Sequence, residues 1–175
     1  QSNHFRRLKV FFQPYLSGTQ SGPEERSAYL LGLVERYSAD KDLVEQLLKG
    51  AFRVHSLMGH QRYHEVKGRS DYGYQPKTVT EESTWYGIHL ELLRKLLKQN
   101  DQIGKVAREI FDLKFHDLYR RQLIRGKVMS VVEELGDWPT GWLVVDRSLK
   151  AFGDKLPEEL KAELNTLKIR LAPAG

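Results

Sequence analysis

Apolar residues recur every three or four positions along most of this chain, and this spacing constrains the fold more than any other feature. Spacings of 4, 4, 3 and 4 connect Leu43, Leu47, Ala51, Val54 and Met58. Spacings of 4, 3 and 4 connect Leu160, Leu164, Leu167 and Leu171. An α-helix turns once in about 3.6 residues, so each series lines one side of a helix and faces a core. The alternation typical of strands is almost missing. We therefore expect an all-α fold.

Several local signals indicate where the helices begin and end. Pro23 precedes two glutamates, as is typical of a first helical turn. Thr78, with a glutamate three residues later, fits a capping box, and Asn100 with Asp101 offers the next cap. Gly136, with a proline three residues later, ends another helix. These signals predict about seven helices, arranged as a bundle or a short stack of helical hairpins.

Length and composition indicate one domain. The 175 residues are enough for one hydrophobic core, and no apolar run approaches the length of a membrane span. The chain has no cysteine, which favours the cytoplasm. It does not begin with Met, so we interpret residues 1–3 as the remnant of a tag and residues 4–175 as a single helical domain of a longer protein. A long loop is expected near residues 65–79, where helical periodicity is lost.

Residues 51–74 raise the question of a metal site, because they contain three histidines. On a continuous helix His60 and His64 share one side, whereas His55 lies about 140° away from His60. Zinc needs three or four protein ligands, so these two histidines alone are an incomplete site. We expect no metal here and keep His60 and His64 as weak candidates beside the simpler interpretation of a solvated helix end.

Nucleic-acid binding is a second hypothesis. Residues 105–127 contain seven basic residues against three acidic ones, in a chain of net charge +5. The loop at 63–77 adds tyrosines beside cations, a combination that single-stranded nucleic acid uses. The candidates are Arg120, Arg121, Arg125, Lys127, Arg62, Arg69, Tyr72 and Tyr74. The alternative is that the tyrosines fix the loop to the helices and that the basic surface contacts another domain. Any binding is expected to be weak.

Sequence motifs of common enzyme classes are missing from the chain. It contains no P-loop, no H-E-x-x-H, no G-x-S-x-G and no dinucleotide fingerprint. We therefore expect no catalytic residues and no cofactor. His89 lies among apolar residues at helical spacing, which is more typical of packing than of a buried base. We interpret Trp85, Trp138 and Trp142 as structural anchors, because tryptophan buries a large apolar area.

Four segments carry a resemblance to a known family. They are WYGIHLELLRKLLKQN, KFHDLYRRQLI, DWPTGWLVVDRSLKAF and LPEELKAELNTLKIRL. Over residues 85–171 this pattern resembles a helical region of large bacterial ATP-binding proteins of the STAND or AAA-like sort. The resemblance implies a non-catalytic interaction or regulatory module that works beside a separate ATPase domain. Its partners would be other domains of the same polypeptide or other proteins. We expect this function first, nucleic-acid binding second and an unrecognised enzyme third.

Overall fold

The computed structural model describes residues 22–52 and 78–174. Seven α-helices and one short 3-10 turn lie in these two ranges. They are α2 (Pro23–Arg36), α3 (Lys41–Ala51), α5 (Val79–Leu97), α6 (Gln102–Tyr119), α7 (Arg125–Leu135), α8 (Gly141–Phe152), η1 (Gly153–Lys155) and α9 (Glu158–Arg170). No described residue belongs to a strand, so the predicted all-α fold is confirmed. None of these helices combines the length and the hydropathy needed to span a membrane.

Short polar side chains begin three of the helices. Asp40 Oδ1 accepts the backbone N–H of Leu43 at 3.1 Å and caps α3. Thr78 Oγ1 accepts the N–H of Glu81 at 3.1 Å and caps α5, as the capping-box pattern predicted. Asp101 Oδ1 accepts the backbone N–H of Gly104 at 3.1 Å and caps α6 in the same way. Each cap satisfies one backbone donor that the first helical turn leaves without a partner.

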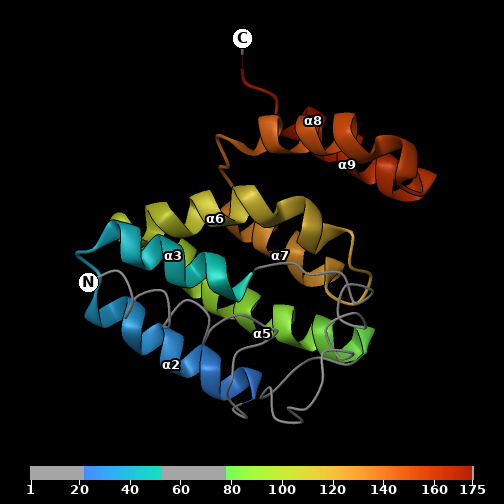
Figure 1. The fold of residues 1–175 in the computed structure, drawn as a ribbon. Helices are drawn as coiled ribbons and strands as arrows, with labels where there is room; N and C mark the ends of the chain where they lie inside the picture. Colours follow the sequence, from blue (N-terminus) through green and yellow to red (C-terminus); the bar gives the residue numbers. More distant parts are fainter. Residues whose placement is uncertain (1–21, 53–77, 175) are drawn as a thin grey trace.

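The helices are stacked in an order that Figure 1 makes visible. Helix α2 packs on α5, α5 packs on α6, and α3 packs on α6 beside them. Helix α7 lies against both α5 and α6. The pair of α8 and α9 lies on the other side of α6 from α2, with α8 in contact with α6. This arrangement agrees with the predicted stack of helical hairpins.

Two of the three tryptophans lie in the core, and each has a partner for its indole N–H. Trp85 donates to the carbonyl oxygen of Ala51 at 3.0 Å, which connects α5 to the end of α3. Trp138 packs between Phe111 and Phe115, with ring centroids 5.4 Å from each. Trp142 is only partly buried. The first two therefore act as anchors in the core, whereas Trp142 lies at its edge.

The chain between α6 and α7 differs from the predicted geometry. On a continuous helix, their spacing of four residues would place Arg121 and Arg125 one turn apart on the same side. Helix α6 instead ends at Tyr119, and α7 begins only at Arg125. The Arg125 side chain donates to the last carbonyl groups of α6, Tyr119 O at 2.8 Å and Arg120 O at 3.1 Å. A cation that binds these carbonyls stabilises the helix end. The two arginines therefore do not share a helix face.

Candidate functional site: a cleft between the end of α6 and the start of α9

A cleft of about 810 Å³ opens where the C-terminal end of α6 faces η1 and the first turn of α9. We call it the α6–α9 cleft. Its charged and titratable lining residues are His116, Asp117, Arg120, Arg125, Lys155 and Glu159. Phe152 contributes an aromatic ring to the same wall. The volume lies within the range of about 300 to 1,000 Å³ that small-molecule sites occupy.

Arg125 is the most strongly positioned cation of the α6–α9 cleft. Its Nε and Nη2 atoms are held by two backbone carbonyls, and its guanidinium lies over the Tyr119 ring, 5.4 Å from the centroid. No carboxylate of the described residues forms an ion pair with it, and Nη1 makes no hydrogen bond to them. Neutral carbonyls fix the side chain without cancelling its charge. The guanidinium is therefore oriented in advance and can still bind an anion.

Two further cations face the same space. Arg120 is half exposed, and its Nε lies 3.8 Å from Asp117 Oδ1, a loose ion pair at the limit of such contacts. Lys155 is exposed and forms no ion pair with the described residues. Glu159 is the other carboxylate of the lining. The cleft therefore presents three cations against two carboxylates, and among the described residues only Arg120 of these cations has an acidic neighbour within 4 Å.

The aromatic part of the wall is a stacked pair. The rings of His116 and Phe152 are nearly parallel, with centroids 3.7 Å apart and an interplanar angle of 9°. His116 Nδ1 lies 2.5 Å from the hydroxyl oxygen of Ser148, which fixes the imidazole ring. Burial lowers the pKa of His116, so the ring is neutral near pH 7. Phe152 remains 38% exposed although it is apolar.

The contact between Ser148 and His116 is not arranged for nucleophilic catalysis. A serine nucleophile needs an accessible hydroxyl and a base that a third group orients. Ser148 is buried, with only 4% of its surface exposed. Its hydroxyl therefore holds the ring of His116 and does not reach a ligand in the cleft.

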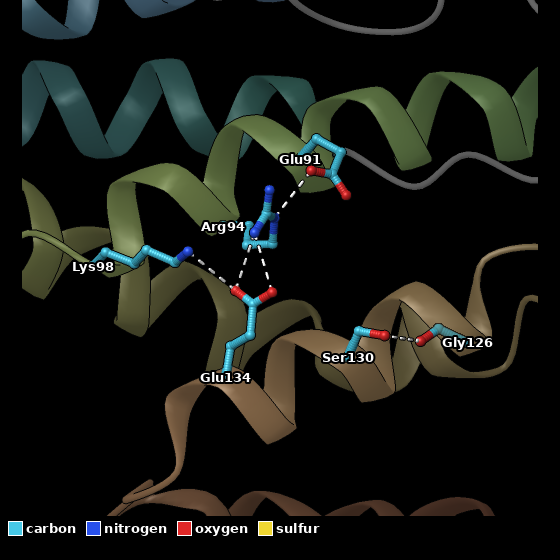
Figure 2. A network of polar contacts seen from close by, with 6 residues as sticks. All are labelled: Glu91, Arg94, Lys98, Gly126, Ser130 and Glu134. Carbon is cyan, nitrogen blue, oxygen red and sulfur yellow. Dashed lines mark hydrogen bonds and ion pairs between the residues drawn. The ribbon is translucent and has the colours of Figure 1, made fainter.

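In a second hollow, of about 430 Å³, the lining arginine is paired with carboxylates. Figure 2 shows Arg94 of α5 facing Glu134 of α7 and Glu91 of its own helix. Both carboxylate oxygens of Glu134 lie 3.1 Å from Arg94 Nη1, and Glu91 accepts from Nε at 3.0 Å. Lys98 adds a contact of 3.4 Å to Glu134. These charges neutralise one another and fasten α5 to α7, unlike the charge of Arg125.

The structure divides the basic surface that the sequence predicted. Arg120 and Arg125 line the α6–α9 cleft, as described above. Arg121 turns inward, forms a buried ion pair with Glu82 and lies over the Tyr86 ring at 4.5 Å. Lys127 is exposed, and its side chain passes over Gly87 of α5. The four cations therefore do not project together.

The remaining candidates lie outside the described residues. They are Arg62, Arg69, Tyr72, Tyr74, His60 and His64, together with most of the loop predicted at 65–79. In the described ranges no group of three or more potential metal ligands comes together. Sequence reasoning missed His116, Phe152 and Lys155. An aromatic residue at the end of a helix, followed by Gly and Pro, was a weak signal for a turn but not for a cleft.

Comparison with known proteins adds no relative for this arrangement. No family model matches the chain, and no curated protein or solved structure gives a significant match. The function is therefore argued from the cleft itself.

Proposed function

We propose that this chain is a non-catalytic helical recognition module of a larger bacterial multidomain protein, and that it binds an anionic group in the α6–α9 cleft. The observation that carries the proposal is Arg125. Its guanidinium is fixed by two backbone carbonyls and forms no ion pair with a described carboxylate. An arginine held in this way loses little side-chain freedom on binding, so most of the interaction free energy is retained.

The position of the cleft in the sequence supports a regulatory role. All of its lining residues lie within residues 85–171, the part that resembles the helical regions of STAND or AAA-like proteins. In such proteins helical regions recognise a trigger or transmit a signal, while another domain handles ATP. The module would then act through a partner or a neighbouring domain rather than through chemistry of its own.

The test is an NMR titration of the ¹⁵N-labelled protein with two chemically different anions, inorganic phosphate and a hexaglutamate peptide. At least one should shift the amide signals of residues 116–125 and 152–160. Lys155→Gln should weaken this response, because it removes a cation that has no acidic partner among the described residues. Lys105→Gln is the matched control, since it removes the same charge from an exposed position at the other end of α6. Shifts that avoid the cleft, or that the two variants reduce equally, would contradict the proposal.

Nucleic-acid binding is the second candidate, because Arg120 and Arg125 both line the cleft. The inward position of Arg121 leaves fewer phosphate contacts than the sequence suggested. We expect weak binding that is largely lost at physiological salt, since each phosphate contact adds about 0.7 to 0.9 to the salt slope. Fluorescence anisotropy with single-stranded and double-stranded oligonucleotides at two salt concentrations measures this. Tight binding at physiological salt would place nucleic-acid recognition first.

A further inference from the structure

The three cations of the α6–α9 cleft come from two parts of the fold, the connection between α6 and α7 and the hairpin of α8 and α9. Arg120 follows the end of α6, Arg125 begins α7, and Lys155 ends η1. Donors on two sides of a cleft suit a tetrahedral anion, whose oxygens point to all sides, better than a planar carboxylate. A phosphate monoester carries a charge of about −1.5 to −2 near pH 7 and has three acceptor oxygens. Three cations against two carboxylates leave the cleft with a net positive charge, which attracts such an anion.

The rest of the wall indicates what the phosphate is attached to. Phe152 is stacked on His116 through one face and is still 38% exposed at the cleft. Ser148 holds the imidazole ring, so the pair is a fixed platform rather than two loose side chains. A planar ring of a ligand can extend this stack, an interaction that tolerates many ring types. The cleft therefore combines a phosphate-binding group with an aromatic surface.

We propose that the α6–α9 cleft binds a phosphorylated compound with a planar aromatic ring, the chemical class of nucleotides. The phosphate lies against Arg120, Arg125 and Lys155, and the ring lies against Phe152. This inference rests on the proposed function, because it names the ligand of the same cleft. A free mononucleotide and the phosphorylated end of a single-stranded nucleic acid share this chemistry.

The experiment compares four probes by isothermal titration calorimetry in low-salt buffer. They are inorganic phosphate, adenosine, AMP and a 5′-phosphorylated oligothymidine of eight nucleotides. AMP should bind at least about tenfold more tightly than phosphate, because stacking of one base on an aromatic side chain is worth roughly that factor or more. AMP should also bind at least about tenfold more tightly than adenosine, which has the same base but no phosphate. An oligonucleotide that binds more tightly than AMP would identify a nucleic-acid end as the source, and equal affinities would identify the free nucleotide.

Two variants separate the two halves of the cleft. Phe152→Leu should lower the affinity for AMP about tenfold and leave that for inorganic phosphate unchanged. Lys155→Gln, at an exposed position, should weaken both, and Lys105→Gln should weaken neither. Circular dichroism and the melting temperature check that each variant is folded.

The unfavourable outcomes differ for the two proposals. If phosphate binds but AMP binds no more tightly, or if Phe152→Leu leaves the AMP affinity unchanged, the nucleotide inference is wrong and the anion-binding function stands. If hexaglutamate binds in the cleft and phosphate does not, the cleft binds carboxylates rather than phosphate. The nucleotide inference is then wrong, and the anion-binding function stands. If neither anion binds at millimolar concentration, both proposals fail.

Discussion

Protonation of His89 should destabilise this protein as the pH falls below neutrality. The ring is fully buried, stacked on Trp85 at 4.3 Å and edge-on to Phe52 at 6.4 Å. Its Nδ1 lies 2.8 Å from the carbonyl oxygen of Trp85. Because a carbonyl only accepts, Nδ1 carries the hydrogen of the neutral ring, and Nε2 is left as an acceptor. Nε2 is buried and has no hydrogen-bond partner among the described residues.

The size of the effect follows from the pKa of His89. Burial lowers it from 6.5 to about 4; the hydrogen bond to Trp85 opposes this shift, and the charge of Arg26 adds to it. Since the folded pKa lies below the unfolded one, the unfolded chain takes up the proton first. The stability that a neutral His89 provides is therefore complete above about pH 6.5 and is lost as the pH falls toward 4. Proton linkage gives a loss of about 2 kcal/mol at pH 5 and about 3 kcal/mol at pH 4.

Urea unfolding at pH 7, 6 and 5 measures this loss in the wild type and in His89→Leu. Carboxylates titrate in the same range, but they are present in both proteins, so their contribution cancels in the difference. The free energy of unfolding of the wild type should fall by about 2 kcal/mol more than that of the variant between pH 7 and pH 5. Parallel pH profiles would refute the reasoning, because they would show that His89 is protonated equally in the folded and unfolded states.

Substitutions at three other positions have expected effects of defined sign. Asp112→Ala should cost about 2 kcal/mol or more, because Asp112 accepts the indole N–H of Trp138 at 2.8 Å and the hydroxyl of Thr140. Asp112→Asn keeps an oxygen acceptor and should cost less; equal losses in urea unfolding would count against this account. Gly141→Ala should cost about 1–3 kcal/mol, since its Cβ would lie 2.5 Å from the Trp138 ring. Gly32→Ala places a methyl group in open space on α2 and should raise the melting temperature, because alanine favours a helix over glycine by up to about 1 kcal/mol. A lower melting temperature would show that the added methyl group is not free of contacts.

Features set by neighbouring residues were predicted well. The cap at Thr78 depends on a side chain that reaches a backbone donor three residues away, and the start of α2 at Pro23 depends on the fixed φ angle of proline. Gly136, with φ of +60°, follows the last residue of α7 as predicted. Such contacts lie within one turn of the chain, so sequence spacing describes them almost completely.

The end of α6 was not predicted, because nothing in its local sequence marks it. The segment YRRQLI contains neither Gly nor Pro, and helical phase alone placed Arg121 on the surface. The partner of Arg121 is Glu82, which lies on α5 and far away in the sequence. A buried ion pair of this kind depends on the tertiary packing, and no count of residues along one helix can reveal it.

The cleft was missed for the same reason. Arg120 and Arg125 come from one part of the chain, whereas Phe152 and Lys155 come from the hairpin of α8 and α9. The composition of residues 105–127 did indicate a basic region. Composition could not distinguish Arg121, which is buried in an ion pair, from Arg125, which two backbone carbonyls hold at the cleft.

Three polar contacts along α6 connect these two parts. Asp112 binds the turn before α8, His116 binds Ser148 on α8, and Tyr119 donates to Glu163 of α9 at 2.7 Å. Spacings of four and three residues place all three contacts on one side of α6.

The last two of these contacts lie at the cleft or beside it, so the same side of α6 that holds the hairpin also sets the distance between Arg125 and Phe152. A ligand that contacts both the arginines and the hairpin would add a further connection between the two parts, beside these contacts and the ion pair of Arg170 with Glu133. Binding in the cleft would thus stabilise the docked position of α8 and α9. The size of this effect equals the difference in binding free energy of the ligand between the docked position and a released one. If the proposed function holds, an occupied cleft and the position of the hairpin would therefore be coupled.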